Sequence, residues 1–304
     1  MKNDKTQKLL FHFWKTTEEQ DQKRLAGQTP PDGVEEVVNL AYIDDGDPMH
    51  LLDIYYPRGT NAALPVIVDI HGGGWMYGTK ELNKNYCLTL ASMGFAVVNL
   101  SYRLCPQTTI PGQIQDIFAA YRWLDGNGAD YFCDLDNVFV TGDSAGGHLA
   151  ALSCAIMGRD GLDEIFDVTL PRLRFNAAGF TCGGFDPLKI LNKPTRLTRA
   201  YKEILLGENC DAYPYASYLN VSALVGGTHF PPIYMVSSKE DFVLSMSVAF
   251  SRKLSEYAVP HRFRKWGIVK GKHLTHVFNV LYPEWTESKK TNEEMLSLFR
   301  EYTK

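Results

Sequence analysis

The sequence predicts an α/β fold with a mostly parallel central sheet and helices on both of its faces. Strand-like and helix-like segments alternate along the 304 residues, and this alternation is typical of βαβ units, in which a helix returns the chain to a parallel strand. With 45% hydrophobic residues, the chain can bury a sizeable core, and α/β folds of this size often form one domain. We therefore expect residues 1–304 to form a single domain.

Short apolar runs indicate the strands, and longer runs with helical spacing indicate the helices. The expected strands are residues 51–56, 65–70, 95–100, 137–141, 175–180, 232–237 and 261–267. The expected helices are residues 83–93, 113–125, 144–157, 244–257 and 291–302. The apolar residues of 113–125 recur on one helical face, so this helix is expected to pack in the core and to carry no site.

Two segments fall outside the alternation. Residues 1–35 are polar and helix-like, and they end at the breaker sequence TPPDG, residues 29–33. Residues 183–230 contain a glycine-rich turn, a helix-like run over 188–206 and a tyrosine-rich stretch. We expect both segments to be elements of a small cap over the site, because exposed aromatic side chains need a surface to cover. A surface excursion without a catalytic role is the alternative for 183–230.

One short motif combines a strand, a tight turn and a helix. Residues 142–146 form a G-x-S-x-G sequence between the apolar run 138–140 and the helix-compatible run 147–152. In a nucleophile elbow of this form, the serine is held in a strained conformation above the sheet edge, and the glycines leave room for the neighbouring strand and helix. Ser144 is therefore the candidate nucleophile, and the N–H of Ala145 a candidate donor to an oxyanion. A glycine-rich turn that merely contains a serine is the alternative.

A second glycine-rich loop, HGGGW at residues 71–75, follows the expected strand 65–70. Consecutive glycines let backbone N–H groups face a developing negative charge without interference from side chains. Gly73 and Gly74 are therefore further candidates for the oxyanion hole. Residues 73–80 also read G-x-x-x-x-G-T-K, but a phosphate-binding loop needs the lysine before the hydroxyl residue, so nucleotide binding is not expected.

Three motifs in this order resemble those of the hormone-sensitive-lipase-like group of α/β-hydrolases, which are esterases and lipases. They are HGGGW at 71–75, SYRLCP at 101–106 and GDSAGG at 142–147. The resemblance covers roughly residues 50–300 and implies the α/β-hydrolase fold. The chain has Cys105 where the group often has alanine and Gln107 where it often has glutamate. These positions lie near the expected pocket, so the differences concern the substrate more than the mechanism.

A serine hydroxyl needs a base to take its proton and an acid to orient that base. In α/β-hydrolases the acid follows the serine along the chain, and the histidine follows the acid. His276 begins a His-x-Phe sequence that matches the group's pattern, and it is preferred to His273 as the base. Asp241 follows the sixth expected strand, where the group has its acid, and it is preferred to Glu240 and Asp186. A helix N-cap is the alternative role for Asp241.

Composition argues against several partners. The formal net charge is −4, whereas nucleic-acid binding requires a basic face. The six cysteines show no CxxC pair and no metal-ligand spacing, and the expected chemistry requires neither a metal nor an organic cofactor.

Residues 1–23 contain only a short apolar patch, so we expect no signal peptide, no membrane partner and a cytoplasmic location. The oligomeric state stays open, a homodimer included.

The motifs predict a serine carboxylic-ester hydrolase that acts on small, short-acyl esters through an acyl-enzyme intermediate, with Ser144, His276 and Asp241 as its catalytic residues. The polarity of residues 1–35, together with the tyrosines, prolines and charges of 183–230, favours a short pocket over a long acyl tunnel. An amidase, arylformamidase or oligopeptidase with the same residues is one alternative. A non-catalytic binding module with the same fold is another.

Overall fold

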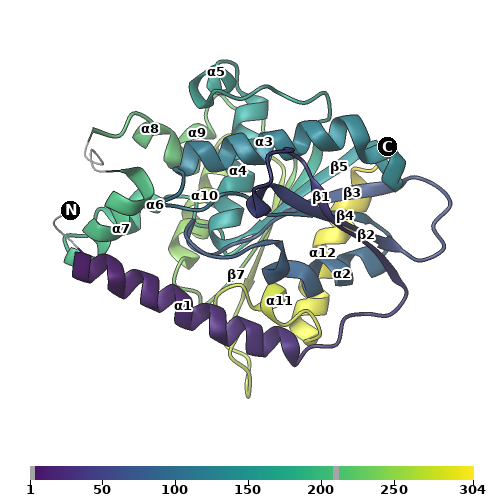
Figure 1. The fold of residues 1–304 in the computed structure, drawn as a ribbon, viewed down its shortest axis with the longest axis horizontal. Helices are drawn as coiled ribbons and strands as arrows, with labels where there is room; N and C mark the ends of the chain where they lie inside the picture. Colours follow the sequence, from purple (N-terminus) through teal and green to yellow (C-terminus); the bar gives the residue numbers. More distant parts are fainter. Residues whose placement is uncertain (1–3, 208–211) are drawn as a thin grey trace.

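The computed structural model describes residues 4–207 and 212–304, and an eight-stranded sheet forms their centre (Figure 1). The strands lie side by side in the order β1-β2-β4-β3-β5-β6-β7-β8. Strand β2 is antiparallel to both of its neighbours, β1 and β4, and the other neighbouring strands are parallel. Their bounds are β1 Val34–Ala41, β2 Leu51–Pro57, β3 Leu64–Ile70, β4 Ala96–Leu100, β5 Cys133–Asp143, β6 Phe175–Thr181, β7 Ile233–Ser238 and β8 His261–Trp266. The expected mostly parallel sheet is confirmed.

Helices cover both faces of this sheet (Figure 1). The α-helices are α1 Asp4–Ala26, α2 Lys84–Ser92, α3 Ile110–Asn127, α4 Ser144–Gly158, α5 Leu162–Phe166, α6 Pro187–Leu191, α7 Arg196–Leu206, α8 Ala216–Leu219, α9 Val221–Leu224, α10 Leu244–Glu256, α11 Phe278–Leu281 and α12 Thr286–Glu301. Short 3₁₀ helices span Pro48–His50, Lys80–Asn83 and Gly128–Tyr131.

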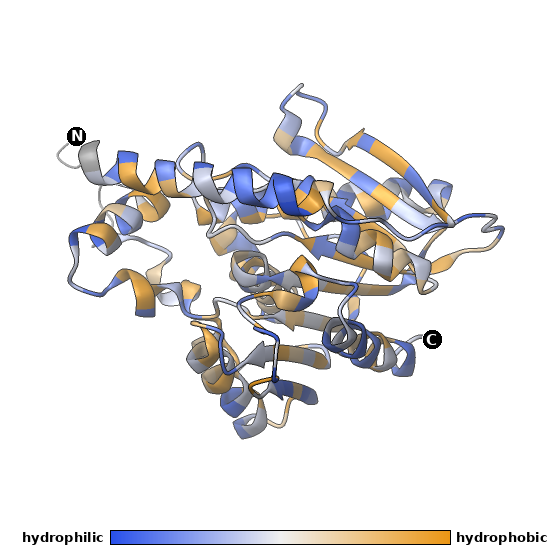
Figure 2. Cartoon of the chain, turned by 90° about the horizontal axis from the view of Figure 1, so that it is seen from below, coloured by the Kyte–Doolittle hydropathy of each residue, from blue (hydrophilic) through white to orange (hydrophobic). Residues whose placement is uncertain are grey.

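Two hydrophobic cores lie on opposite faces because successive strand residues point to opposite sides. In β3, Val66 and Val68 pack in the core that contains residues of α3, α4 and α10. Ile67, between them, packs in the core that contains residues of α2 and α12. Figure 2 shows the hydrophobic colour concentrated in the strands and in the helices that lie on them.

The main differences from the expected elements lie in β1, in residues 188–206 and at the start of the last helix; the short helices α5, α8 and α9 were not expected either. Strand β1 was not expected, because its sequence has no clear alternation of apolar and polar residues. In the structure Val34 is its one buried residue. The expected helix over 188–206 is two helices, α6 and α7, with Pro194 in the connection and Thr195 capping α7 through the N–H of Thr198. The last helix begins at Thr286 rather than at residue 291.

Helix α1 lies across the molecule and packs against α7 (Figure 1). Near its C-terminal end, Arg24 Nη1 donates to the carbonyl oxygen of Leu281 at 3.0 Å. Gln28 Nε2 donates to the same oxygen at 2.6 Å, and Asn85 Nδ2 donates to Gln28 Oε1 at 3.0 Å. These bonds fasten α1 to segments that are distant in the sequence, close to the carboxyl edge of the parallel strands.

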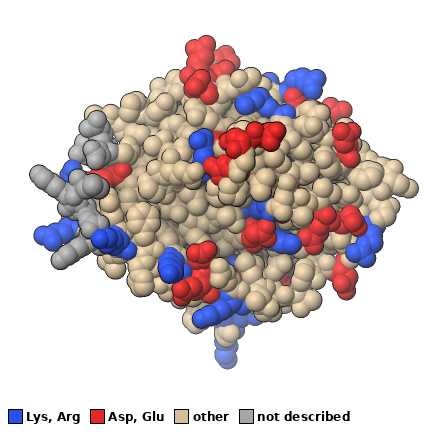
Figure 3. Space-filling model, viewed as in Figure 1, with Lys and Arg blue, Asp and Glu red and all other residues tan. Residues whose placement is uncertain are grey.

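Charges of both signs are interspersed over the face drawn in Figure 3. Two basic side chains of β8 pair with acids of α12: Arg262 Nη2 lies 2.7 Å from Glu301 Oε2, and Arg264 pairs with Glu294. Within residues 4–207 and 212–304, the helices include none with the length and apolar character needed to cross a membrane.

Candidate active site

The turn between β5 and α4 holds Ser144 at the first residue of the helix, with a positive φ of 52°. A serine rarely adopts this left-handed conformation, which stores strain and recurs at functional sites. A Cβ on Gly142 would lie 2.5 Å from the carbonyl oxygen of Gly146, and a Cβ on Gly146 would overlap the carbonyl oxygen of Ile70. The two glycines are thus required by the close approach of backbone, as expected for a nucleophile elbow.

A line of hydrogen bonds joins the three predicted catalytic side chains. Ser144 Oγ lies 2.8 Å from His276 Nε2, and His276 Nδ1 lies 2.7 Å from Asp241 Oδ1. A carboxylate can only accept, so the proton of the neutral imidazole is on Nδ1, and Nε2 is left to accept from the serine hydroxyl. The Asp241 side chain is fully buried and the His276 side chain 21% exposed. The geometry is that of a nucleophile, a base and an orienting acid.

Asp241 keeps its negative charge despite its burial. Burial alone would raise the pKa of this carboxyl. Hydrogen bonds from His276, Ser237 and Val243 outweigh it, together with the positive charge of His276 when that ring is protonated, so the pKa lies below its usual value. The Ser237 hydroxyl donates at 2.6 Å to Oδ2, and the Val243 N–H donates at 3.1 Å to Oδ1. The carboxylate therefore remains ionised at neutral pH and can stabilise an imidazolium at His276.

The alternative histidines have other partners. The His273 side chain is 86% exposed, and its Nδ1 lies 2.7 Å from Glu240 Oε1, away from the serine. The His148 ring is buried. Its Nδ1 accepts a hydrogen bond from Trp75 Nε1 at 3.3 Å, and its Nε2 lies 2.9 Å from the Leu219 carbonyl oxygen. Burial lowers the pKa of His148 to about 4, so this ring stays neutral at physiological pH. It connects Trp75 to Leu219 rather than serving as the base.

The orientation of the HGGG loop is set by hydrogen bonds to its carbonyl groups. The Gly72 carbonyl accepts from His71 Nδ1 at 2.7 Å, and the Gly73 carbonyl accepts from the N–H groups of Met76 at 3.1 Å and Tyr77 at 3.0 Å. In a trans peptide the N–H points opposite to the C=O. Holding these two carbonyls therefore restricts the directions of the N–H groups of Gly73 and Gly74, the two donors predicted in this loop.

A buried carboxylate ties this loop to the elbow. Asp143 Oδ1 accepts from the N–H of Gly72 at 2.9 Å and from Asn83 Nδ2 at 2.8 Å. Asn83 Nδ2 also donates to Asp69 Oδ2 at 2.8 Å. Asp143 precedes Ser144 and Ala145, so its bond to Gly72 holds the loop and the elbow, the two sources of oxyanion donors, in one arrangement.

A cavity of about 570 Å³ opens beside Ser144 and His276. Its volume lies in the usual range for small-molecule sites. The other lining residues are mostly apolar or aromatic, and they include Phe13, Trp14, Pro187, Ile190, Leu191, Tyr201, Phe242, Leu281 and Tyr282. The cavity therefore suits an apolar substrate whose reacting carbon is held at the serine.

Helix α1 forms part of this wall, although residues 1–35 are mostly polar. Phe13 and Trp14 line the cavity, and the Trp14 ring stacks on Tyr77 with the ring centroids 5.5 Å apart. Of the α1 side chains, Phe13 and Trp14 bring apolar surface to the cavity, and the polar Thr17, Gln20, Asp21 and Arg24 line it as well. The adjacent Phe13 and Trp14 in a polar segment are the sequence signal for this role.

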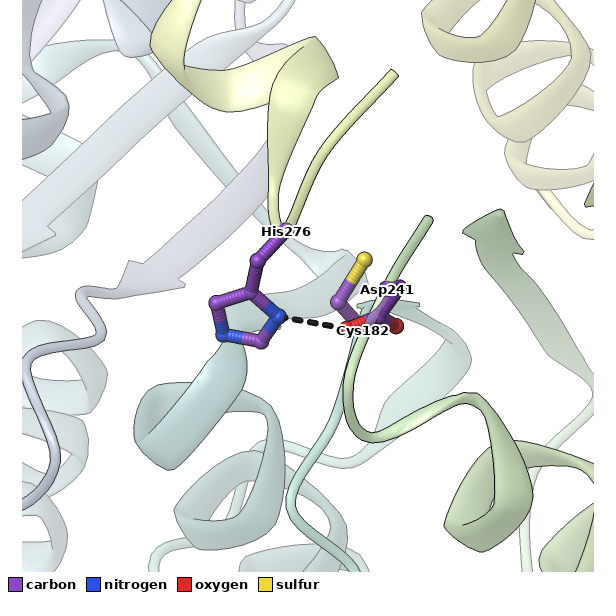
Figure 4. A group of neighbouring side chains, drawn as sticks. All are labelled: Cys182, Asp241 and His276. Carbon is purple, nitrogen blue, oxygen red and sulfur yellow. Dashed lines mark hydrogen bonds and ion pairs between the residues drawn. The ribbon is translucent and has the colours of Figure 1, made fainter. Parts of the chain in front are cut away.

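Cys182 lies beside the acid and the histidine (Figure 4). The ligand-type atoms of Cys182, Asp241 and His276 all lie within 4.8 Å of one another. The Cys182 sulfur accepts from the N–H of Val277 at 3.4 Å, and burial raises the pKa of the thiol well above its usual value. A protonated thiol is a poor metal ligand, and the other two groups are engaged with each other. Cys182 is best explained as a support for the histidine loop.

Comparisons with known proteins agree with this geometry. Residues 52–256 match the BD-FAE family model. The carboxylic ester hydrolase LipN of Mycobacterium tuberculosis is 38% identical over 104 residues, which are 34% of this chain and 27% of LipN. Carboxylesterase NlhH of the same species is 38% identical over 108 residues, 35% of this chain and 34% of NlhH. The matched regions thus span about a third of these curated relatives' own length.

Solved structures match over nearly the whole chain. Esterase B from Lactobacillus rhamnosis has a TM-score of 0.92 and 36% identity, covering 99% of this chain and 96% of the other. A structure of esterase B with a C4-C4 SN3 tributyrin phosphonate inhibitor has a TM-score of 0.93 and 37% identity, with the same coverage. The family match and the shared fold confirm the resemblance drawn from the three motifs: the chain belongs to the BD-FAE family and to the hormone-sensitive-lipase-like esterase group of α/β-hydrolases.

Proposed function

We propose that the protein is a serine carboxylic-ester hydrolase that acts on small, short-acyl esters through an acyl-enzyme intermediate. The observation that carries this proposal is the line of hydrogen bonds from Ser144 through His276 to Asp241, beside a cavity and a glycine-rich loop. The carboxylesterases among its relatives and esterase B with its phosphonate inhibitor support it.

In this mechanism Ser144 Oγ attacks the ester carbonyl while His276 Nε2 takes its proton. The N–H groups of Gly73, Gly74 and Ala145 stabilise the oxyanion of the tetrahedral intermediate, and Asp241 stabilises the imidazolium. His276 then protonates the leaving alcohol, and an acyl group remains on Ser144. Water, activated by the same histidine, attacks the acyl-enzyme and releases the acid. These steps require neither a metal nor an organic cofactor.

Paired p-nitrophenyl esters and p-nitroanilides of the same acyl group separate the proposed activity from its alternatives. We expect turnover of the esters and at least 10²-fold slower turnover of the anilides, because the cavity wall offers mostly apolar side chains and few groups to assist an amine leaving group. Faster hydrolysis of the anilides would favour an amidase or peptidase. No turnover of either would favour a binding module.

The cavity volume motivates a prediction about chain length. A space of about 570 Å³ must hold both the acyl and the alcohol portions of an ester. Each buried CH₂ contributes up to about 0.8 kcal/mol, so kcat/KM should rise from C2 to C4. We expect it to fall from C4 to C12, because a longer chain displaces the carbonyl from the serine. Measurements on p-nitrophenyl esters of C2, C4, C8 and C12 acids test this, and a maximum at C8 or beyond would contradict it.

The proposal extends to the organisation of the chain. Residues 1–304, of which 1–3 and 208–211 lie outside the described residues, are proposed as a single domain in which α1 and residues 183–230 cap the site, and the partner is a small-molecule ester. The contact of α1 with α7 and the place of both in the cavity wall support the cap. A cytoplasmic location belongs to the same proposal, and fractionation of expressing cells tests it.

A further inference from the structure

One hydrogen bond to the HGGG loop comes from the predicted cap rather than from the segments around the sheet. The phenolic O–H of Tyr201, on α7, donates to the carbonyl oxygen of Gly74 at 2.6 Å. The two residues are 127 positions apart in the sequence. Burial raises the pKa of Tyr201, so the phenol keeps its proton and remains a donor.

The cap lies directly against Gly74. A Cβ on Gly74, which has a φ of 59°, would overlap the Tyr201 hydroxyl and would come within 2.5 Å of the Trp14 ring. Only glycine allows such a close approach together with this φ. Helix α7, through Tyr201, and helix α1, through Trp14, therefore meet the loop at the same residue.

This contact is made at a glycine of the loop, where side-chain sterics restrict the backbone little. The N–H of Gly74 belongs to the peptide unit whose carbonyl, that of Gly73, is held by the N–H groups of Met76 and Tyr77. The next peptide unit carries the Gly74 carbonyl, and Tyr201 holds it. Between the two units lie the φ and ψ angles of a glycine, which have little steric restriction. The backbone of Gly74, and with it the N–H group, keeps one orientation when the peptide units on both sides of Gly74 are held by hydrogen bonds.

We propose that Tyr201 is a positioning residue for the oxyanion hole, through which α7 of the cap fixes the orientation of the Gly74 N–H group. This inference rests on the proposed serine ester hydrolysis. The oxyanion hole is then fully ordered only while α7 contacts the loop. Because α1 and α7 also line the cavity, substrate binding there is coupled to the stabilisation of the transition state. Tyr201 acts through the backbone and does not itself contact the oxyanion.

The test compares p-nitrophenyl butyrate with its thiono analogue, in which sulfur replaces the carbonyl oxygen. Sulfur is larger and accepts hydrogen bonds weakly, so the thionoester gains little from an oxyanion hole whose N–H groups are placed for oxygen. The acylation rate constant for each ester is measured from p-nitrophenolate release with enzyme in excess over substrate. Its dependence on enzyme concentration separates binding from the chemical step.

We expect Tyr201→Phe to lower the acylation rate constant of the oxoester about tenfold, less than the roughly 10²–10³-fold loss typical of removing a direct donor. Its effect on the thionoester should be under about twofold, so the oxo-to-thiono ratio falls, and the apparent dissociation constant should stay within about twofold. The matched control is Tyr218→Phe on α8, a tyrosine of the cap whose ring packs on Phe166. This control should leave both rate constants unchanged.

An equal loss for the two esters, a change in binding alone, or no change would overturn the role of Tyr201 and assign the residue to packing. Thermal unfolding of Tyr201→Phe checks that its fold is intact. Failure of the proposed function has a different signature, because the unmodified protein would then release no p-nitrophenolate from the oxoester.

Discussion

His276→Ala is expected to lower kcat/KM for p-nitrophenyl butyrate by roughly 10⁵–10⁶-fold, the scale of such losses when the base of a catalytic triad is removed. The ring nitrogen 2.8 Å from Ser144 Oγ is the group that can accept the hydroxyl proton and return it to the leaving alcohol. Alanine removes both steps at once. Initial rates with purified protein, corrected for spontaneous hydrolysis, measure the loss.

The matched control is His273→Ala, three residues earlier in the same loop. The His273 ring is mostly exposed and pairs with Glu240, so its removal should change kcat/KM by less than about threefold. A large loss in His273→Ala with activity retained in His276→Ala would contradict the assignment of the base. Similar large losses in both variants would point to disruption of the loop, which the thermal unfolding curve of each variant would reveal.

Ser144→Ala is expected to abolish acyl-enzyme formation and to lower kcat/KM on the order of 10⁶-fold. The Oγ atom provides the covalent bond of the intermediate, and water cannot replace it at the same position. The fold should persist, because this atom's bond to His276 is a single contact at a strained turn. The measurements are kcat/KM and the melting temperature.

Ser144→Gly provides the control for backbone strain. Glycine adopts a φ of 52° without a steric penalty, so this variant should melt no lower than Ser144→Ala and should be equally inactive. More than about 1% of the unmodified activity in either variant would contradict the role of Ser144 as the nucleophile, since the residual rate without a triad member is far smaller.

The parts of the site that depend on short stretches of chain could be predicted from the sequence. The elbow around Ser144 depends on glycines whose missing side chains make room for adjacent backbone. The glycine-rich loop depends on φ angles of 114° at Gly73 and 59° at Gly74. His276 and Asp241 were located by short patterns beside strand ends, and the structure brings both to Ser144. Their catalytic roles remain predictions.

Features that depend on distant contacts could not be predicted. The apolar residues of α1 are outnumbered by charged ones, so the adjacent Phe13 and Trp14 are a weak signal in the sequence. Their place in the cavity wall follows from how α1 docks, with Trp14 stacked on Tyr77. The bond from Tyr201 to Gly74 follows from how α7 docks on the loop, and no periodicity in the sequence encodes that. Strand β1 lies at the edge of the sheet and is largely exposed. Such strands lack the continuous apolar runs by which the other strands were predicted.

The most direct test of the central claim is peptide mapping by mass spectrometry after reaction with a fluorophosphonate, an electrophile that bonds to an activated serine oxygen. We expect one adduct per chain, located on Ser144, with loss of ester hydrolysis in proportion to labelling and no labelling of Ser144→Ala. An adduct on Ser101, Ser237 or Ser238, or full activity with Ser144 unlabelled after prolonged reaction, would contradict the account.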